Sequence, residues 1–93
     1  MEAKMYNKQI WITETDPVKL KDKFEKLLAD SGFSVLKYCD YFFKPFGYTC
    51  LFLLGESHLA IHTFPEENKS YIEISSCVKS FYDEFLLLFE KDI

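Results

Sequence analysis

The chain has 93 residues, of which 48% are hydrophobic and 18% aromatic, and its formal net charge is −4. Its length predicts a single domain spanning residues 1–93, and its apolar content argues against an intrinsically disordered protein. Lysines and acidic residues are interspersed without a basic run. A nucleic-acid partner is therefore not expected, because binding to phosphates needs a concentrated positive patch.

The start of the chain shows no signal for export or membrane insertion. Residues 1–4 lack the apolar segment of a signal peptide, and no apolar run approaches the roughly 20 residues that span a bilayer. The three cysteines, Cys39, Cys50 and Cys77, are odd in number and show no metal-ligand spacing. We expect reduced thiols in a cytoplasmic protein, without a metal site or a membrane partner.

The first half of the chain predicts a strand, a helix and a second strand. Residues 5–14 have the composition of a strand. Asp16 is a favourable N-cap and Pro17 suits the first helical position, so we expect a helix to begin there. Gly32 is expected to end this helix, and a strand over 33–43 follows. The apolar residues at helical spacing are Leu20, Phe24, Leu27 and Leu28.

The second half predicts three strands and a helix. The strands are expected over residues 48–54, 58–63 and 71–77. Pro45 and Gly47 indicate a turn before the first of them, and another turn is expected over 65–68. Ser80 is expected to cap the final helix. The apolar residues on one face of that helix are Phe81, Phe85 and Leu88.

The element order β-α-β-β-β-β-α predicts an α+β fold. We expect a two-layer sandwich, in which an antiparallel sheet of four to five strands carries two helices on one face. Residues 50–54 are apolar at consecutive positions, and strand side chains alternate between faces, so both faces of this strand need cover. Because two helices cover one face only, the other is expected to pack against a second copy in a homodimer. The alternative is a strand buried centrally within one chain.

A serine, two histidines and a cysteine gather on two of the predicted strands. Ser57 follows an apolar strand and stands between Glu56 and His58. In an extended strand His58 and His62 share a face, and Cys77 ends the next strand. These residue types could act as nucleophile, base and acid. A serine at a strand end is more often a turn residue, a histidine on a half-buried strand is more often structural, and a cysteine there is more often a small hydrophobic residue, so residue types alone favour a structural interpretation.

The order of residues around Ser57 is more specific. The string Glu-Ser-His-Leu-Ala-Ile-His-Thr-Phe-Pro-Glu at 56–66 resembles the signature of the S-adenosylmethionine decarboxylase proenzymes of the short prokaryotic type, in which Trp replaces Phe64. Residues 43–49 resemble the Phe-x-Pro-x-Gly-Val-Ser segment of that family, and residues 74–77 lie where the family has Phe-Thr-Cys-Gly. The resemblance is specific over residues 43–77.

The resemblance implies a self-cleaving decarboxylase. The Ser57 hydroxyl would attack the Glu56 carbonyl and convert the peptide bond into an ester. Elimination would then divide the chain into residues 1–56 and 57–93, which stay associated, and leave a pyruvoyl group at position 57 as a covalent cofactor. By the same resemblance His62 is the base of this processing. Thr49 stands where the family has a serine that hydrogen-bonds the intermediate.

The resemblance also implies roles in turnover. The substrate would be S-adenosylmethionine, decarboxylated for spermidine synthesis after its amine forms a Schiff base with the pyruvoyl carbonyl. Cys77 matches the family's proton donor, and Glu66 matches the acid that binds the ribose hydroxyls. Phe43 matches the aromatic residue that stacks on adenine and faces the sulfonium. His58 receives no chemical role.

Thr49 and Phe46 depart from the family pattern. Thr49 keeps the hydroxyl of the usual serine and adds a methyl group, and Phe46 stands where a polar residue, often His, is usual. These differences leave two alternatives open. One is a pyruvoyl-dependent ornithine or arginine decarboxylase on the same scaffold. The other is a homologue that does not cleave and acts as a binding partner.

Overall fold

The computed structural model describes residues 2–92 and has the predicted element order. Its helices are α1 (Pro17–Asp30) and α2 (Lys79–Lys91), and a short 3-10 turn, η1, spans Pro65–Glu67. Within the described residues, neither helix is long and apolar enough to cross a membrane. The strands are β1 (Tyr6–Ile12), β2 (Val35–Phe42), β3 (Tyr48–Leu54), β4 (Ser57–Phe64) and β5 (Lys69–Ser76).

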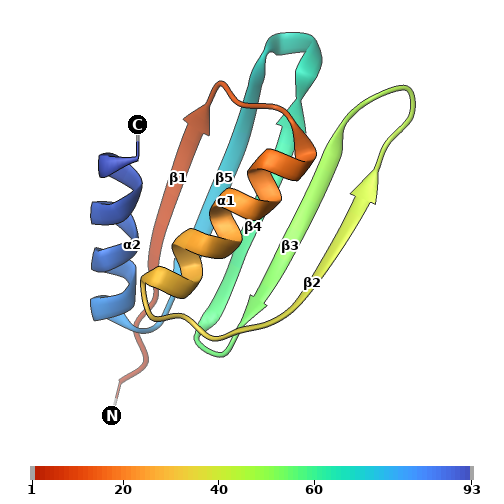
Figure 1. Ribbon diagram of the computed structural model, residues 1–93. Helices are drawn as coiled ribbons and strands as arrows, with labels where there is room; N and C mark the ends of the chain where they lie inside the picture. Colours follow the sequence, from red (N-terminus) through yellow and green to blue (C-terminus); the bar gives the residue numbers. More distant parts are fainter. Residues whose placement is uncertain (1, 93) are drawn as a thin grey trace.

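The strands form one antiparallel sheet in the order β1-β5-β4-β3-β2. Strands β2 to β5 form a meander. The first strand of the chain, β1, pairs with the last, β5, so β1 and β2 are the two edge strands (Figure 1). The turn between β3 and β4 lies at one end of the sheet, whereas the β2–β3 and β4–β5 turns lie at the opposite end (Figure 1). The predicted α+β fold with two helices on one face is confirmed.

The hydrophobic core lies between the sheet and the two helices. Phe24 of α1 stacks on Phe85 and Phe89 of α2, with ring centroids 6.3 and 6.2 Å apart. The four residues predicted for the buried face of α1 are all buried. Alternate strand residues face the helices, as the period of a pleated strand requires. The buried ones include Tyr48, Cys50, Phe52, Leu54, Leu59, Ile61, Ile72 and Ile74.

Helix α1 begins and ends as its sequence predicts. The Asp16 carboxylate accepts a hydrogen bond of 2.9 Å from the Lys19 N–H, and Pro17 occupies the first helical position. At the other end Ser31 is the C-cap and Gly32 follows with φ +105°, a conformation that L side chains rarely adopt. The N–H of Phe33 then donates to the Leu28 carbonyl and closes the helix.

Helix α2 begins before the predicted cap. Its N-cap is Val78, and Ser80 lies inside the helix, so the capping role expected for Ser80 is wrong. The reason is a local turn: the Ser76 hydroxyl oxygen accepts a hydrogen bond of 3.0 Å from the Val78 N–H. This turn directs the chain into the helix at once, and the Tyr82 N–H already bonds to the Val78 carbonyl.

The sheet face away from the helices, here called the open face, has no cover within the described residues. Leu51 and Leu53 point to this face and are 47% and 51% exposed, while their neighbours in β3 are buried in the core. The alternative of a strand buried centrally within one chain is therefore wrong. The strand residues that the register places on the open face are Asn7, Gln9, Trp11, Lys37, Cys39, Tyr41, Thr49, Leu51, Leu53, His58, Ala60, His62, Phe64, Lys69, Tyr71, Glu73 and Ser75.

Gly32→Ala is expected to destabilise the fold by about 1–3 kcal/mol, because the residue would hold a positive φ and its Cβ would lie 3.0 Å from the Phe81 ring. The measurement is urea unfolding of a chain that also carries Ser57→Ala, which keeps the polypeptide in one piece.

Gly55→Ala is the matched control, since a Cβ there would meet Ser34 at 3.5 Å, an ordinary contact. Equal losses for the two substitutions would contradict the interpretation of the α1 terminus.

Candidate functional site

The turn between β3 and β4 is held from two sides. On one side the Gly55 N–H donates to the Ser34 carbonyl at 2.9 Å, and the Ser34 N–H donates to the Glu56 carboxylate at 3.2 Å. On the other side the Cys77 N–H donates to the Glu56 carbonyl at 3.2 Å. Residues far apart in the sequence thereby fix the peptide that joins positions 56 and 57.

The backbone of Ser57 is strained. Its φ is +146°, which is rare for a residue with a side chain and costs on the order of 1–3 kcal/mol. Ser57 also begins β4, where its backbone pairs with Leu54 on one side and Ser76 on the other. The strain therefore lies next to the amide that the resemblance marks for cleavage, and the surrounding pairing maintains it.

Two donors of Cys77 point at the carbonyl of Glu56. Besides the N–H bond, its thiol lies 3.5 Å from the same oxygen. Donors in this position stabilise negative charge that develops on a carbonyl oxygen under attack. Cys77 is exposed and lies directly after β5, one position beyond the end of that strand.

His58 lies next to Ser57, although no chemical role was predicted for it. Its Nδ1 is 3.4 Å from the Ser57 hydroxyl oxygen. His58 is exposed and borders a largely apolar hollow of ≈ 380 Å³ on the open face. Its position directly after the serine was the available signal, but adjacent strand residues ordinarily point to opposite faces, so sequence spacing argued against a contact.

A second cluster of predicted residues lies on the same face. The hydroxyl of Thr49 in β3 is 3.2 Å from Nδ1 of His62 in β4, and these two residues are paired across the strands. Both line a cleft of ≈ 260 Å³ together with Phe43, Phe46, Phe64 and Glu66. The predicted aromatic and acidic binding residues thus share one cleft with the predicted processing base.

Phe64 has an aromatic neighbour from another strand. Its ring centroid is 6.0 Å from that of Trp11 in β1, and Tyr71 lies 5.1 Å from Trp11 on the same face. The indole that the family pattern places at position 64 is absent, and a tryptophan from the edge strand lies beside the phenylalanine instead.

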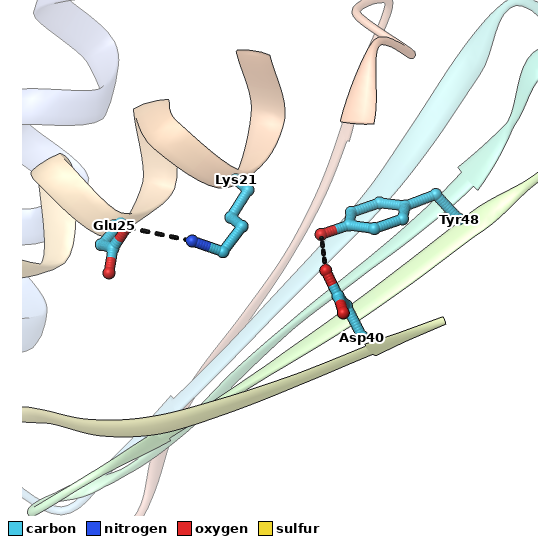
Figure 2. Close-up of polar contacts among 4 residues, drawn as sticks. All are labelled: Lys21, Glu25, Asp40 and Tyr48. Carbon is cyan, nitrogen blue, oxygen red and sulfur yellow. Dashed lines mark hydrogen bonds and ion pairs between the residues drawn. The ribbon is translucent and has the colours of Figure 1, made fainter. Parts of the chain in front are cut away.

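Polar contacts also lie on the helix side of the sheet. The hydroxyl of Tyr48, the residue before Thr49, donates to the Asp40 carboxylate at 2.7 Å, while Lys21 pairs with Glu25 on α1 (Figure 2). The Tyr48 N–H also donates to the Thr63 hydroxyl at 2.8 Å. Burial, followed by the hydrogen bond to Asp40, raises the pKa of Tyr48 above its usual value, so this hydroxyl stays protonated.

The structure separates the predicted site residues into two groups. The first group is Glu56, Ser57 and Cys77, and the second is Phe43, Thr49, His62 and Glu66. His62 lies five positions beyond Ser57 in β4, which is roughly 17 Å at a rise of about 3.4 Å per residue. The two groups therefore lie at opposite ends of the sheet, and within one chain their side chains are too far apart to form a single site.

Comparison with known proteins decides the family. A sequence model described as S-adenosylmethionine decarboxylase matches residues 12–89. The chain belongs to the S-adenosylmethionine decarboxylase family. An S-adenosylmethionine decarboxylase proenzyme of Geobacillus kaustophilus is 32% identical over 73 residues, which cover 74% of this chain and 59% of that protein. S-adenosylmethionine decarboxylase proenzyme 2 of Bacillus cereus is 49% identical over 47 residues, which cover 50% of this chain and 38% of that protein.

A solved structure shares the fold of this family member. The crystal structure of the adenosylmethionine decarboxylase from Aquifex aeolicus matches with a TM-score of 0.70 and 19% identity, over 94% of this chain and 81% of that chain. At this identity the similarity concerns the fold alone. The segments matched in the two relatives above span less than two thirds of their lengths. Among residues 2–92, no three His, Cys, Asp or Glu side chains are grouped to hold a metal ion.

Tyr48→Phe is expected to destabilise the chain by about 1–3 kcal/mol at pH 7, because the Asp40 carboxylate loses its donor. Since the folded state raises the pKa of Tyr48, this contribution is complete below the unfolded value of about 10 and declines as the pH rises above it. The difference between the two proteins should therefore narrow in alkaline urea titrations.

Tyr41→Phe is the control, since Tyr41 is 62% exposed and its loss should change stability by less than about 0.5 kcal/mol. An equal loss for both substitutions would contradict the role given to the Tyr48 hydroxyl.

Proposed function

We propose that this chain is a proenzyme that cleaves itself between Glu56 and Ser57, and that the mature protein decarboxylates S-adenosylmethionine and so supplies spermidine synthesis. The observation that carries the proposal is the strained Ser57 next to a carbonyl that accepts both donors of Cys77. Family membership supports the substrate class. The proposal includes a cytoplasmic location, which three free cysteines favour.

Maturation needs a nucleophile, a polarised carbonyl and a base. Ser57 carries the hydroxyl next to the Glu56 carbonyl, and the N–H and thiol of Cys77 stabilise the charge that forms on the carbonyl oxygen. Relief of the backbone strain at Ser57 lowers the barrier to rearrangement. His62, hydrogen-bonded to Thr49, is the base proposed to remove the Cα proton of residue 57 in the elimination.

The chemistry of these residues fits a pyruvoyl group at position 57. Such a group supplies an electrophilic carbonyl that binds an amine and accepts the electrons left by departing carbon dioxide. Cys77 would then hold the proton that returns to the substrate, since its exposed thiol already lies beside position 56. Glu66 and Phe43 line the cleft where the ribose hydroxyls and the adenine would bind.

Two copies of the chain would complete the site. The open face exposes Leu51 and Leu53, and an apolar face of this kind favours packing against a second sheet. If a two-fold axis crosses this face, the end of one sheet that carries Ser57 meets the end of its partner that carries His62. The homodimer would then contain two active sites, each built from both chains.

The size of the cleft supports a shared site. At ≈ 260 Å³, the hollow around His62 and Glu66 is smaller than the range of about 300–1,000 Å³ that is typical of small-molecule sites. It also lacks the reactive serine, which lies at the other end of the sheet. A second sheet placed over the open face would both enclose the cleft and supply that serine.

The decisive measurement for the proposed function is the intact mass of the purified protein. Wild-type protein should give two fragments, 1–56 and 57–93, with the second lacking a free amino terminus and reacting with hydrazine. Ser57→Ala should remain a single chain without carbonyl reactivity. A wild-type chain that stays whole after prolonged incubation would contradict the proposal and favour a non-cleaving homologue.

Release of labelled carbon dioxide then identifies the substrate. S-adenosylmethionine should be decarboxylated and ornithine and arginine should not. If the protein decarboxylated ornithine or arginine in preference, the proposed pyruvoyl chemistry would stand and the proposed substrate would be wrong.

A mixed dimer tests whether the site is shared. A His62→Ala chain keeps Ser57, and a Ser57→Ala chain keeps His62, so each fails to cleave alone. When the two are co-expressed with different tags, the His62→Ala chain should be cleaved, because its serine meets the histidine of the other chain.

The control partner carries both substitutions and should give no rescue. Cleavage of the His62→Ala chain alone, or no cleavage in verified mixed dimers, would overturn the shared site.

A further inference from the structure

The proposed maturation needs a base at its first step, and the histidine assigned to processing does not reach Ser57 within one chain. The nearest imidazole is that of His58, whose Nδ1 lies 3.4 Å from the Ser57 hydroxyl oxygen. We infer that His58 is the base that activates Ser57 for the N-to-O acyl shift. This inference rests on the proposed self-cleavage and adds a catalytic residue to its first step.

The strained backbone explains why the two side chains meet. In a regular strand, adjacent side chains point to opposite faces, so a serine and the histidine after it are far apart. Ser57 has φ +146°, outside the range of a regular strand, and its hydroxyl lies next to the imidazole of His58. The strain at this position therefore has a chemical consequence, which is to place a nucleophile beside a base.

The surroundings of His58 suit a base that acts on a neighbour. The side chain is exposed, so Nδ1 is free of a competing core contact, and only the Ser57 hydroxyl lies within hydrogen-bonding distance in the described structure. With Nδ1 unprotonated, the hydroxyl donates to it. On the carbonyl side, Cys77 supplies the donors for the oxygen that becomes charged.

In the acyl shift, His58 alone carries the one proton that has to move from oxygen to nitrogen. As the Ser57 oxygen bonds to the Glu56 carbonyl carbon, the hydroxyl proton moves to Nδ1 of His58, and the carbonyl oxygen becomes an oxyanion held by Cys77. When this intermediate collapses, the carbon–nitrogen bond between residues 56 and 57 breaks, and His58 returns the proton to that nitrogen. The products are an ester and an amine, with His58 unchanged.

Two histidines on one face of β4 thereby divide the maturation. In the step that forms the ester, His58 takes the proton from the Ser57 hydroxyl of its own chain and returns it to the backbone nitrogen of residue 57. His62 is hydrogen-bonded to Thr49 at the opposite end of the strand, and removes the Cα proton of residue 57 in the later elimination. The division predicts that loss of each histidine stops the chain at a different chemical stage.

His58→Asn tests this division, because asparagine can accept the hydrogen bond from Ser57 but cannot take up its proton. Ester formation should become about 100-fold slower, the lower end of the effect expected for a general base. His62→Ala on the same strand and face is the matched control. Uncleaved chains of both are treated with neutral hydroxylamine, which cuts esters and leaves amides, and are then weighed by intact-mass spectrometry.

The expected result is that uncleaved His58→Asn resists hydroxylamine, whereas uncleaved His62→Ala is cut between 56 and 57. Added imidazole should restore cleavage of His58→Ala, an effect that a structural role would not produce. Wild-type cleavage rates in His58→Asn, or hydroxylamine-sensitive material in that variant, would overturn the role of His58 while leaving the proposed function intact. A wild-type chain that never cleaves would overturn both.

Discussion

The hydrogen bond from the Cys77 N–H to the Glu56 carbonyl is the contact on which the candidate site depends. It ties the β3–β4 turn to the segment that follows β5, and it holds the peptide at 56–57 while the pairing of β4 keeps Ser57 at φ +146°. Without this tie the turn could relax to an ordinary hairpin. The hydrogen bond and the strained torsion therefore lie on the two sides of the same peptide, and the Cys77 N–H donates to the carbonyl that the proposed self-cleavage would attack.

Strand geometry explains why the remaining site residues lie elsewhere. Ser57 begins β4 and His62 lies towards its far end, and a strand holds its residues at a fixed rise. No rearrangement of loops brings them together, because both belong to the centre of the sheet. The proposed second copy across the open face would bring Ser57 near a histidine of the other chain, bury Leu51 and Leu53, and enclose the small cleft.

The departures from the family pattern lie around that cleft and leave the Ser57 end intact. Thr49 still bonds to His62 despite its extra methyl group, and Phe46 makes the cleft more apolar than a polar residue would. Phe64 lies beside Trp11 from β1, which provides aromatic surface where the family has an indole. The chain thus retains the groups proposed for self-cleavage and differs mainly where a substrate would bind.

Periodicity and caps in the sequence determined the element order, the buried face of α1 and the exposed apolar strand, because these follow from local spacing and from residues such as Asp16 and Gly32. The ordered string at 56–66 likewise indicated the family. Strand ends differ from the prediction by a few residues. Helix α2 begins at Lys79 with Val78 as its N-cap, because the Ser76 hydroxyl forms a turn that sequence spacing does not reveal. Only the tertiary structure decided that Cys77 meets Glu56, that His58 meets Ser57 and that His62 does not. These facts depend on strand pairing and on one strained torsion, which bring together or hold apart residues irrespective of their distance along the chain.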